Sequence, residues 1–276
     1  MGEKGRHYPN IIQSIGLTGL VMLVMGLYGF ILGLFFELAG MEYDMKNPVI
    51  YSLQIIGGVV FSIGGIIYYV MKRKGLSLKE IKGANIKDIV FYNQVFLSFV
   101  GLYIVVHVLG EYIEIIFPKS DFYNNLIEGL MGQNIVLVFI ATCIVAPIFE
   151  ETFFRGIILR GLLKNTRHWI AISLSSLLFA IFHLNIWQGI IAFITGIFIG
   201  WIFYKTASLF IAIFANFVIN CTNLIIFNSL ITISGYSNNN GIGFQTIWFI
   251  LIGLFLCIVG MLLIGNSKRY SDSDTI

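Results

Sequence analysis

Long runs of apolar residues, separated by short polar stretches, follow one another along the chain. A helix needs about 17 to 25 mostly apolar residues to cross the hydrocarbon core of a bilayer, and each of these runs is of that order. The pattern predicts an all-α fold, a polytopic bundle in one domain over residues 1–266, followed by a polar tail at 267–276. The eight predicted spans are 11–36, 49–70, 89–109, 133–154, 168–184, 187–204, 207–228 and 246–265.

The composition agrees with that pattern. Of the 276 residues, 58% are hydrophobic and only 11% are charged, which excludes an ordinary soluble domain. The predicted environment is the lipid bilayer of the cell membrane, and nothing in the composition supports binding to nucleic acid. The three cysteines all lie in apolar runs without metal-ligand spacing, which is typical of small buried side chains.

The basic residues divide unequally between the two faces that eight spans would create. All of the 17 Lys and Arg residues except Lys46 and Lys119 fall on one face, if Arg155 and Arg160 are counted in the loop after the fourth span. Cytoplasmic loops carry such an excess of positive charge. The asymmetry therefore predicts a multi-pass protein with both termini in the cytoplasm.

Two loops have a distinctive composition. Residues 72–88 mix Lys with Leu and Ile, which is typical either of an interfacial amphipathic helix or of a run that anchors the topology. Residues 228–245 carry no charge and are rich in Gly and Asn, which favours a mobile surface loop.

Residues 147–161 place two carboxylates and an arginine inside apolar sequence. Ionisable groups in a bilayer are costly, so Glu150, Glu151 and Arg155 are candidates for a functional site. On a helix, Glu151 and Arg155 are four residues apart and can form an ion pair, whereas Glu150 points about 100° away. A buried ion network that serves packing alone is the alternative interpretation.

Other polar residues are expected at the same depth. Counted from the turns that join the later spans, Glu150, His183 and Asn220 lie about 15 to 17 residues along their helices, or about 22 to 26 Å at 1.5 Å per residue. Asn216 lies one turn below Asn220 on the same face. Three helices therefore bring Glu, His and Asn to one layer, although His and Asn also serve as interhelical hydrogen-bonding groups.

Two motifs in this layer resemble those of the CAAX prenyl protease and bacteriocin-processing family, also called the CPBP or Abi family of intramembrane glutamic endopeptidases. The first, Glu-Glu-x-x-x-Arg, is matched by Glu150, Glu151 and Arg155. The second, Phe-x-x-x-His, is matched by Phe179 and His183.

The third motif of that family is usually His-x-x-x-Asn or His-x-x-x-Asp, and here the corresponding pair is Asn216 and Asn220. The resemblance covers roughly residues 133–228. An amide at Asn216 can donate a hydrogen bond but cannot act as a base near neutral pH.

The resemblance implies hydrolysis of a peptide bond inside the membrane, in a peptide or protein substrate that is lipidated in some relatives. Glu150 would act as general base on a water molecule, and His183 would hold the same water from the facing helix. Glu151 and Arg155 would balance charge and fix the helix. Bacterial relatives are linked to maturation of secreted peptides, immunity to them, or control of other membrane proteins.

Asn216 and Asn220 can point N–H groups at the oxygen that becomes negative during hydrolysis, as in an oxyanion hole. A zinc site ordinarily has three protein ligands, and this layer offers Glu150, His183 and a second carboxylate without a second histidine. We therefore expect no cofactor, with a divalent metal such as zinc as the alternative. Two other functions stay open: a lapsed enzyme that binds a peptide or membrane partner, and a proton-coupled transporter.

Overall fold

The computed structural model describes residues 8–44, 47–116, 134–228 and 244–266. Within these ranges the regular elements are all helices, and one isolated β-bridge joins Gly83 to Ser208. The main helices are α1 (Ile11–Leu38), α2 (Pro48–Ser52), α3 (Gly65–Lys74), α4 (Leu78–Lys82), α5 (Ile89–Ile116), α7 (Ile135–Phe139), α8 (Ala146–Glu151), α9 (Arg160–Leu163), α10 (His168–Phe182), α11 (Ile186–Thr206), α12 (Leu209–Asn228) and α13 (Phe244–Asn266).

Some of these elements join into longer helices through π-helical turns. The segment from α2 to α3 includes η1 (Leu53–Gly57) and η2 (Val60–Gly64), and the segment from α7 to α9 includes η3 (Ile140–Val145) and η4 (Thr152–Leu159). In the described part of the chain, six helices are long and apolar enough to cross a membrane, and α10 and residues 209–225 are shorter apolar helices. The predicted polytopic all-α fold is thus confirmed, and eight is an approximate count of its spans.

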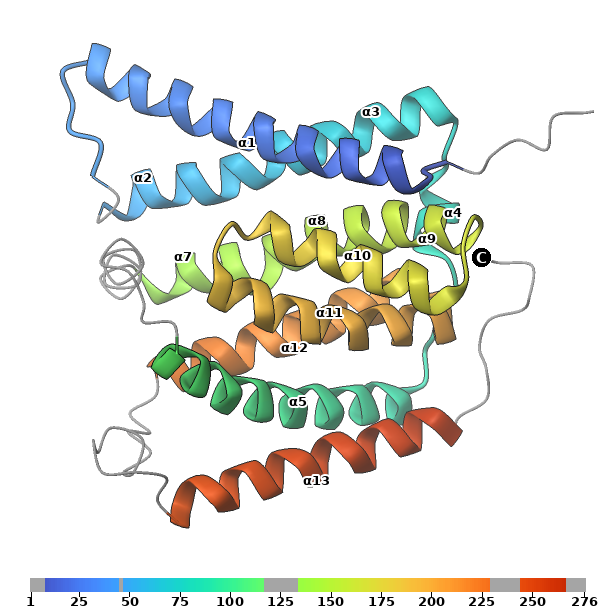
Figure 1. Ribbon diagram of the computed structural model, residues 1–276. Helices are drawn as coiled ribbons and strands as arrows, with labels where there is room; N and C mark the ends of the chain where they lie inside the picture. The colour runs from blue at the N-terminus through green and yellow to red at the C-terminus, as the bar shows by residue number, and fades with distance from the viewer. Residues whose placement is uncertain (1–7, 45–46, 117–133, 229–243, 267–276) are drawn as a thin grey trace, which may run out of the picture.

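Successive helices run in alternating directions and form one bundle, with their axes lying across the view in Figure 1. The pair formed by α1 and the α2–α3 helix lies along one edge, and α5 with α13 lies along the other. Between them lie the α7–α9 helix, α10, α11 and α12. The described N-terminal end, the end of α13, and the α9–α10 and α11–α12 turns all lie at the same side of the bundle, as an even number of crossings requires.

The turns that set the depth of the central helices are short. The α9–α10 turn falls at residues 164–167, where the sequence predicted it. Asn185 caps α11 by accepting hydrogen bonds from the backbone N–H groups of Trp187 and Gln188. Ala207 ends α11 with a positive φ of 49°, and α12 begins two residues later.

The loop at residues 75–88 packs against the bundle. Ser77 and Glu80 form a capping box at the start of α4, and Ile81 on that helix is only 1% exposed. Ala84 N–H donates to the carbonyl of Ala207, which ties the loop to the α11–α12 turn. The segment therefore forms a short helix that docks on the bundle.

The fourth helix is longer than predicted. It continues beyond residue 154 to Leu163, and Arg155 lies inside it with 0% exposure. The assignment of Arg155 to a charged loop at the membrane face is therefore wrong: its partners in the bundle keep it buried. The predicted tail at 267–276 and most of the predicted loop at 228–245 lie outside the described residues.

Candidate functional site

A proline shapes the helix that carries the two glutamates. At the first residue of α8, the N–H of Ala146 donates to the carbonyl of Ala141, five residues back, which is the π-helical pattern. The same pattern would pair Pro147 with the carbonyl of Thr142, but proline has no N–H. The amide Nδ2 of Asn220 on α12 donates to the Thr142 carbonyl instead, at 2.8 Å.

Asn220 therefore satisfies a carbonyl that Pro147 leaves without its backbone donor. A buried carbonyl without a partner is costly, so this bond joins α12 to the fourth helix at a defined height. The structure places Asn220 at the helix irregularity, and no hydrogen bond joins it to either glutamate among the described residues.

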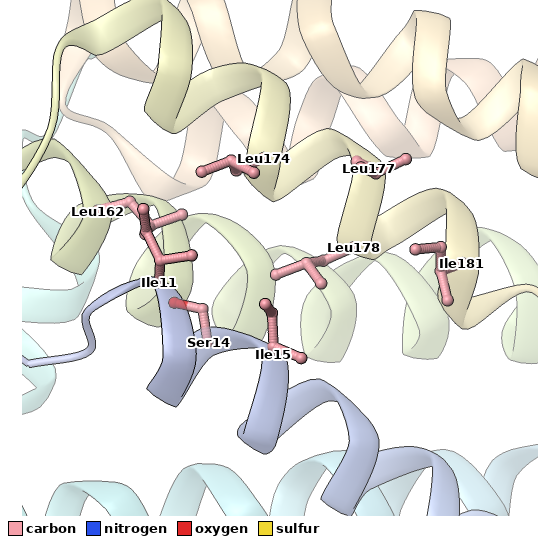
Figure 2. A pocket seen from close by; sticks show the side chains of 8 residues that line it. All are labelled: Ile11, Ser14, Ile15, Leu162, Leu174, Leu177, Leu178 and Ile181. Carbon is pink, nitrogen blue, oxygen red and sulfur yellow. The ribbon is translucent and has the colours of Figure 1, made fainter.

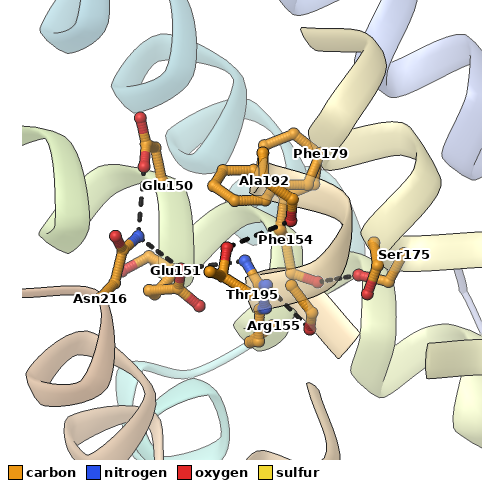
Figure 3. A network of polar contacts seen from close by, with 12 residues as sticks. Glu150, Glu151, Phe154, Arg155, Ser175, Phe179, Ala192, Thr195 and Asn216 are labelled. Carbon is orange, nitrogen blue, oxygen red and sulfur yellow. Dashed lines mark hydrogen bonds and ion pairs between the residues drawn. The ribbon is translucent and has the colours of Figure 1, made fainter. Parts of the chain in front are cut away.

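Glu151 and Arg155 form the ion pair that their spacing predicts. Arg155 Nη1 donates to Glu151 Oε1 at 2.9 Å, and both side chains are fully buried (Figure 3). Arg155 Nη2 also donates to the carbonyl of Gly196 on α11 at 3.2 Å. Its guanidinium lies over the ring of Phe179 on α10, 4.7 Å from the ring centre. One arginine thus touches the fourth helix, α10 and α11.

Asn216 joins the two carboxylates to each other and to α12. Its Nδ2 donates to Glu150 Oε2 at 3.2 Å and to Glu151 Oε1 at 2.7 Å (Figure 3). An amide nitrogen carries two hydrogens, and both are used here. Asn216 is 4% exposed, so it acts as a buried bridge. The predicted oxyanion-hole role would require it to leave the carboxylates.

The two glutamates have different environments. Glu151 shares the positive charge of Arg155, whereas Glu150 receives a hydrogen bond from the neutral Asn216 amide. Glu150 is 8% exposed and Glu151 is fully buried. With both carboxylates ionised, the cluster of two glutamates and one arginine keeps one negative charge. The contacts assign that charge to Glu150, which also has the greater access to its surroundings.

His183 directly follows the last residue of α10 and caps that end of the helix. Its Nδ1 is 2.9 Å from the carbonyl of Phe179. Since a carbonyl oxygen only accepts, Nδ1 carries the hydrogen, and in the neutral ring Nε2 holds the free lone pair. The rings of Phe179 and Phe182 pack edge-on against the imidazole, at 4.9 and 5.8 Å between centres.

The structure therefore brings four of the six predicted site residues into direct contact: Glu150, Glu151, Arg155 and Asn216. His183 is connected to them through Phe179, whose ring contacts both Arg155 and the imidazole. No hydrogen bond between His183 and a glutamate occurs in the described part of the chain.

The side chains of the cluster do not form a set of ligands that fits a zinc ion. Among the described residues, no three His, Cys, Asp or Glu side chains converge as metal ligands. The site instead combines two carboxylates with Asn216, whose amide hydrogens face the carboxylates. A structural or catalytic zinc ordinarily takes three or four nitrogen, sulfur or oxygen ligands from the protein.

An apolar groove of about 210 Å³ lies between α1 and the α9–α10 hairpin (Figure 2). Its only polar side chain is Ser14, whose hydroxyl donates to the carbonyl of Asn10. None of the predicted site residues lines the groove. Its lining is Ile11, Ser14, Ile15, Leu162, Leu174, Leu177, Leu178 and Ile181.

Two contributions to the site were absent from the sequence-based prediction. Gly196 was not predicted as a site residue, although its carbonyl accepts a hydrogen bond from Arg155. Thr142 was not selected, although its carbonyl accepts from Asn220. The position of Pro147, five residues after Thr142, is the local signal that marks this carbonyl; no sequence signal marks the Gly196 carbonyl.

Comparisons with known proteins find sequence similarity over the part of the chain that contains the candidate site residues. Residues 132–222 match the family described as Type II CAAX prenyl endopeptidase Rce1-like. The chain is 28% identical over 124 residues to the "Putative membrane peptidase YdiL" of Bacillus subtilis (strain 168). This alignment covers 45% of this chain and 49% of that protein. The match thus spans about half the length of this relative. No solved structure matches the chain.

Proposed function

The match over residues 132–222 confirms the resemblance to the CAAX-type endopeptidase family, and on this premise we propose that the chain is an intramembrane endopeptidase. The observation that carries the proposal is the buried pair Glu150 and Glu151, held by Arg155 and Asn216 inside a membrane-spanning helix. Buried ionisable groups of this kind mark functional sites in membrane proteins.

In the proposed reaction, Glu150 acts as general base and removes a proton from water while the water oxygen attacks the peptide carbonyl carbon. The C–N bond then breaks, and Glu150 returns the proton to the leaving amine. His183 contributes Nε2, the free ring nitrogen, as an acceptor for the second hydrogen of the same water. Arg155 and Asn216 hold Glu151 and so keep the helix in place.

The structure leads us to revise the role of the two asparagines. Both hydrogens of the Asn216 amide face the carboxylates, and Asn220 bonds to the Thr142 carbonyl. We therefore propose Asn216 and Asn220 as positioning residues: Asn216 aligns the two carboxylates, and Asn220 holds the helix that carries them.

The proposed substrate is a membrane-associated peptide or protein, lipidated or not, as in the processing of prenylated proteins or bacteriocins. A multi-pass protein in the cell membrane can receive such a substrate laterally through lipid or from the aqueous face. The excess of Lys and Arg at one face leads us to propose that both termini are cytoplasmic.

Cleavage of a library of short lipidated and unlipidated peptides by the protein in liposomes tests the proposal. Glu150→Gln keeps the shape of the side chain but removes the base, so we expect a loss of about 100-fold or more in rate. His183→Ala should also lose activity, and a chelator should leave wild-type activity unchanged. Glu37→Gln, which changes an exposed carboxylate on α1, is the matched control. A rate that Glu150→Gln leaves unchanged would contradict the proposal.

A second function, peptide binding without cleavage, is favoured by one observation. Asn216 occupies the family's usual histidine position, and its amide ties up both carboxylates. If no library peptide is cleaved by the wild type but Asn216→His cleaves one, the protein is a lapsed enzyme. Binding of that peptide to the wild type, measured by its fluorescence anisotropy, would then define the function.

A further inference from the structure

Helix α11 carries none of the motif residues, yet it contributes a backbone oxygen to the buried charge cluster. The carbonyl of Gly196 accepts a hydrogen bond from Arg155 Nη2 at 3.2 Å. Because Arg155 Nη1 binds Glu151 at the same time, the guanidinium is fixed at two points. A planar guanidinium can make two such bonds in fixed directions, which a lysine ammonium cannot do.

The space around Gly196 is filled on two sides. A Cβ atom at this position would lie 3.3 Å from Arg155 Nη2, 3.1 Å from Ser176 Cβ and 3.2 Å from Ser176 Oγ. Phe179 on α10 packs against the same guanidinium, with its ring centre 4.7 Å from the guanidinium carbon. A hydrogen fits at Gly196 without disturbing Arg155, whereas a methyl group must displace either the guanidinium or Ser176.

A continuous series of hydrogen bonds leads from this glycine to the proposed base. The Gly196 carbonyl holds Arg155, Arg155 holds Glu151 Oε1, and Glu151 Oε1 accepts from the Asn216 amide. The same amide donates to Glu150. All five residues are buried, and we therefore expect a shift of the guanidinium to move Glu150 as well.

We propose that Gly196 is a positioning residue for catalysis, which holds the Glu150–Glu151 pair in register through Arg155. The inference rests on the proposed endopeptidase function and deepens it, because it assigns α11 a part in the site. It differs from the packing role that Gly196 and Gly200 would share as small residues one turn apart.

Gly200→Ala is a matched control for Gly196→Ala. A Cβ at Gly200 would lie 3.0 Å from Ile172 Cγ2 and 3.6 Å from Leu159 Cδ2, so it disturbs the same α10–α11 packing without touching Arg155. We expect Gly196→Ala to lower kcat by about 10- to 100-fold with KM within about twofold of wild type, since small misplacements of catalytic groups have such costs. Gly200→Ala should keep kcat within about twofold at a similar loss of thermal stability.

A double-mutant cycle with Arg155→Lys identifies the route of the effect. If the methyl group that Gly196→Ala adds acts through the guanidinium, combining Gly196→Ala with Arg155→Lys should cause no further loss of kcat. Independent losses that multiply would overturn the inference, as would wild-type kcat in Gly196→Ala. Equal losses of kcat in Gly196→Ala and Gly200→Ala would also overturn it, since packing would then explain both.

These outcomes can be distinguished from failure of the proposed function. If that function is wrong, the wild type and Glu150→Gln will show the same cleavage rate. In that case thermal unfolding of the same variants still tests the contact. If the two residues are coupled, the losses of stability in Gly196→Ala and Arg155→Lys should not add up in the double variant. Additive losses would show that the two residues are uncoupled. Should Gly196→Ala not fold, Arg155→Lys alone tests the contact, because an ammonium group cannot hold Glu151 and the Gly196 carbonyl in the two fixed directions that a guanidinium provides. A fall in kcat is expected, and wild-type kcat in Arg155→Lys would contradict the inference.

Discussion

Replacing Arg155 by methionine should strongly destabilise the protein. Methionine fills a similar length of space but carries no charge and no N–H donors. The change removes the 2.9 Å ion pair with Glu151 and the bond to the Gly196 carbonyl. Glu151 is fully buried, so among the described residues its carboxylate would keep only the Asn216 amide as a hydrogen-bond partner.

Breaking a buried ion pair by removing one partner costs about 3 to 5 kcal/mol, because the remaining charge stays in a medium that solvates it poorly. Thermal midpoints of chains of 150 to 250 residues shift by about 2 to 4 °C per kcal/mol. The expected fall in the unfolding temperature of Arg155→Met is therefore about 6 to 20 °C.

The double variant Glu151→Gln with Arg155→Met separates charge from shape. Both partners are then neutral, and replacing a buried ion pair by neutral groups of similar volume is often nearly neutral in free energy. The double variant should recover most of the lost stability while activity stays low. Arg73→Met, at an exposed arginine, should change stability by no more than about 0.5 kcal/mol.

The assay is thermal unfolding in detergent, followed by intrinsic tryptophan fluorescence or by the fraction of protein that remains monodisperse. Two results would refute the reasoning. One is an unfolding temperature for Arg155→Met close to that of wild type. The other is a double variant as unstable as the single one, since the cost would then come from lost packing and not from an unpaired charge.

Two further predictions concern other parts of the structure. Asn220→Leu should lower the free energy of unfolding by about 1 to 3 kcal/mol, because the Thr142 carbonyl loses its hydrogen-bond donor. Adding Pro147→Ala to this variant should restore part of that stability, because alanine supplies a backbone N–H. Thermal unfolding of the single and the double variant measures both effects. Hydrogen bonds from the Ser77 backbone N–H and hydroxyl lower the pKa of Glu80 below its ordinary value of 4.5. The capping box therefore stabilises α4 fully above pH 4.5, and this stabilisation is lost as the pH falls through the lowered pKa. Amide exchange protection in α4 should fall over that range in wild type and not in Glu80→Gln.

The elements of the candidate site could largely be predicted from local spacing. Glu151 and Arg155 are four residues apart in an apolar helix, which is sufficient to predict their ion pair. The short turn at residues 164–167 set the depth of the fourth and fifth helices. The depth predicted for Asn220 correctly indicated that α12 faces the fourth helix, but Asn216, one turn below, is the residue that contacts the glutamates.

The donors and acceptors that each side chain would use could not be predicted in this way. Asn216 and Asn220 look equivalent in sequence, but one binds two carboxylates and the other a backbone carbonyl that Pro147 leaves unpaired. Which group an amide binds depends on atoms of another helix within about 3 Å, and helical periodicity does not resolve positions that finely.

The sequence by itself determined that this protein is an all-helical membrane protein with a buried Glu-Glu-x-x-x-Arg helix. Apolar run length and the cost of buried charge act locally, whatever the rest of the chain does. Only the tertiary structure decided that Arg155 lies inside the bundle between α10 and α11, and that the carbonyl of Gly196 holds it. That contact joins residues 41 positions apart, at a point where a Cβ added to Gly196 would lie only 3.1 to 3.3 Å from atoms of Ser176 and Arg155.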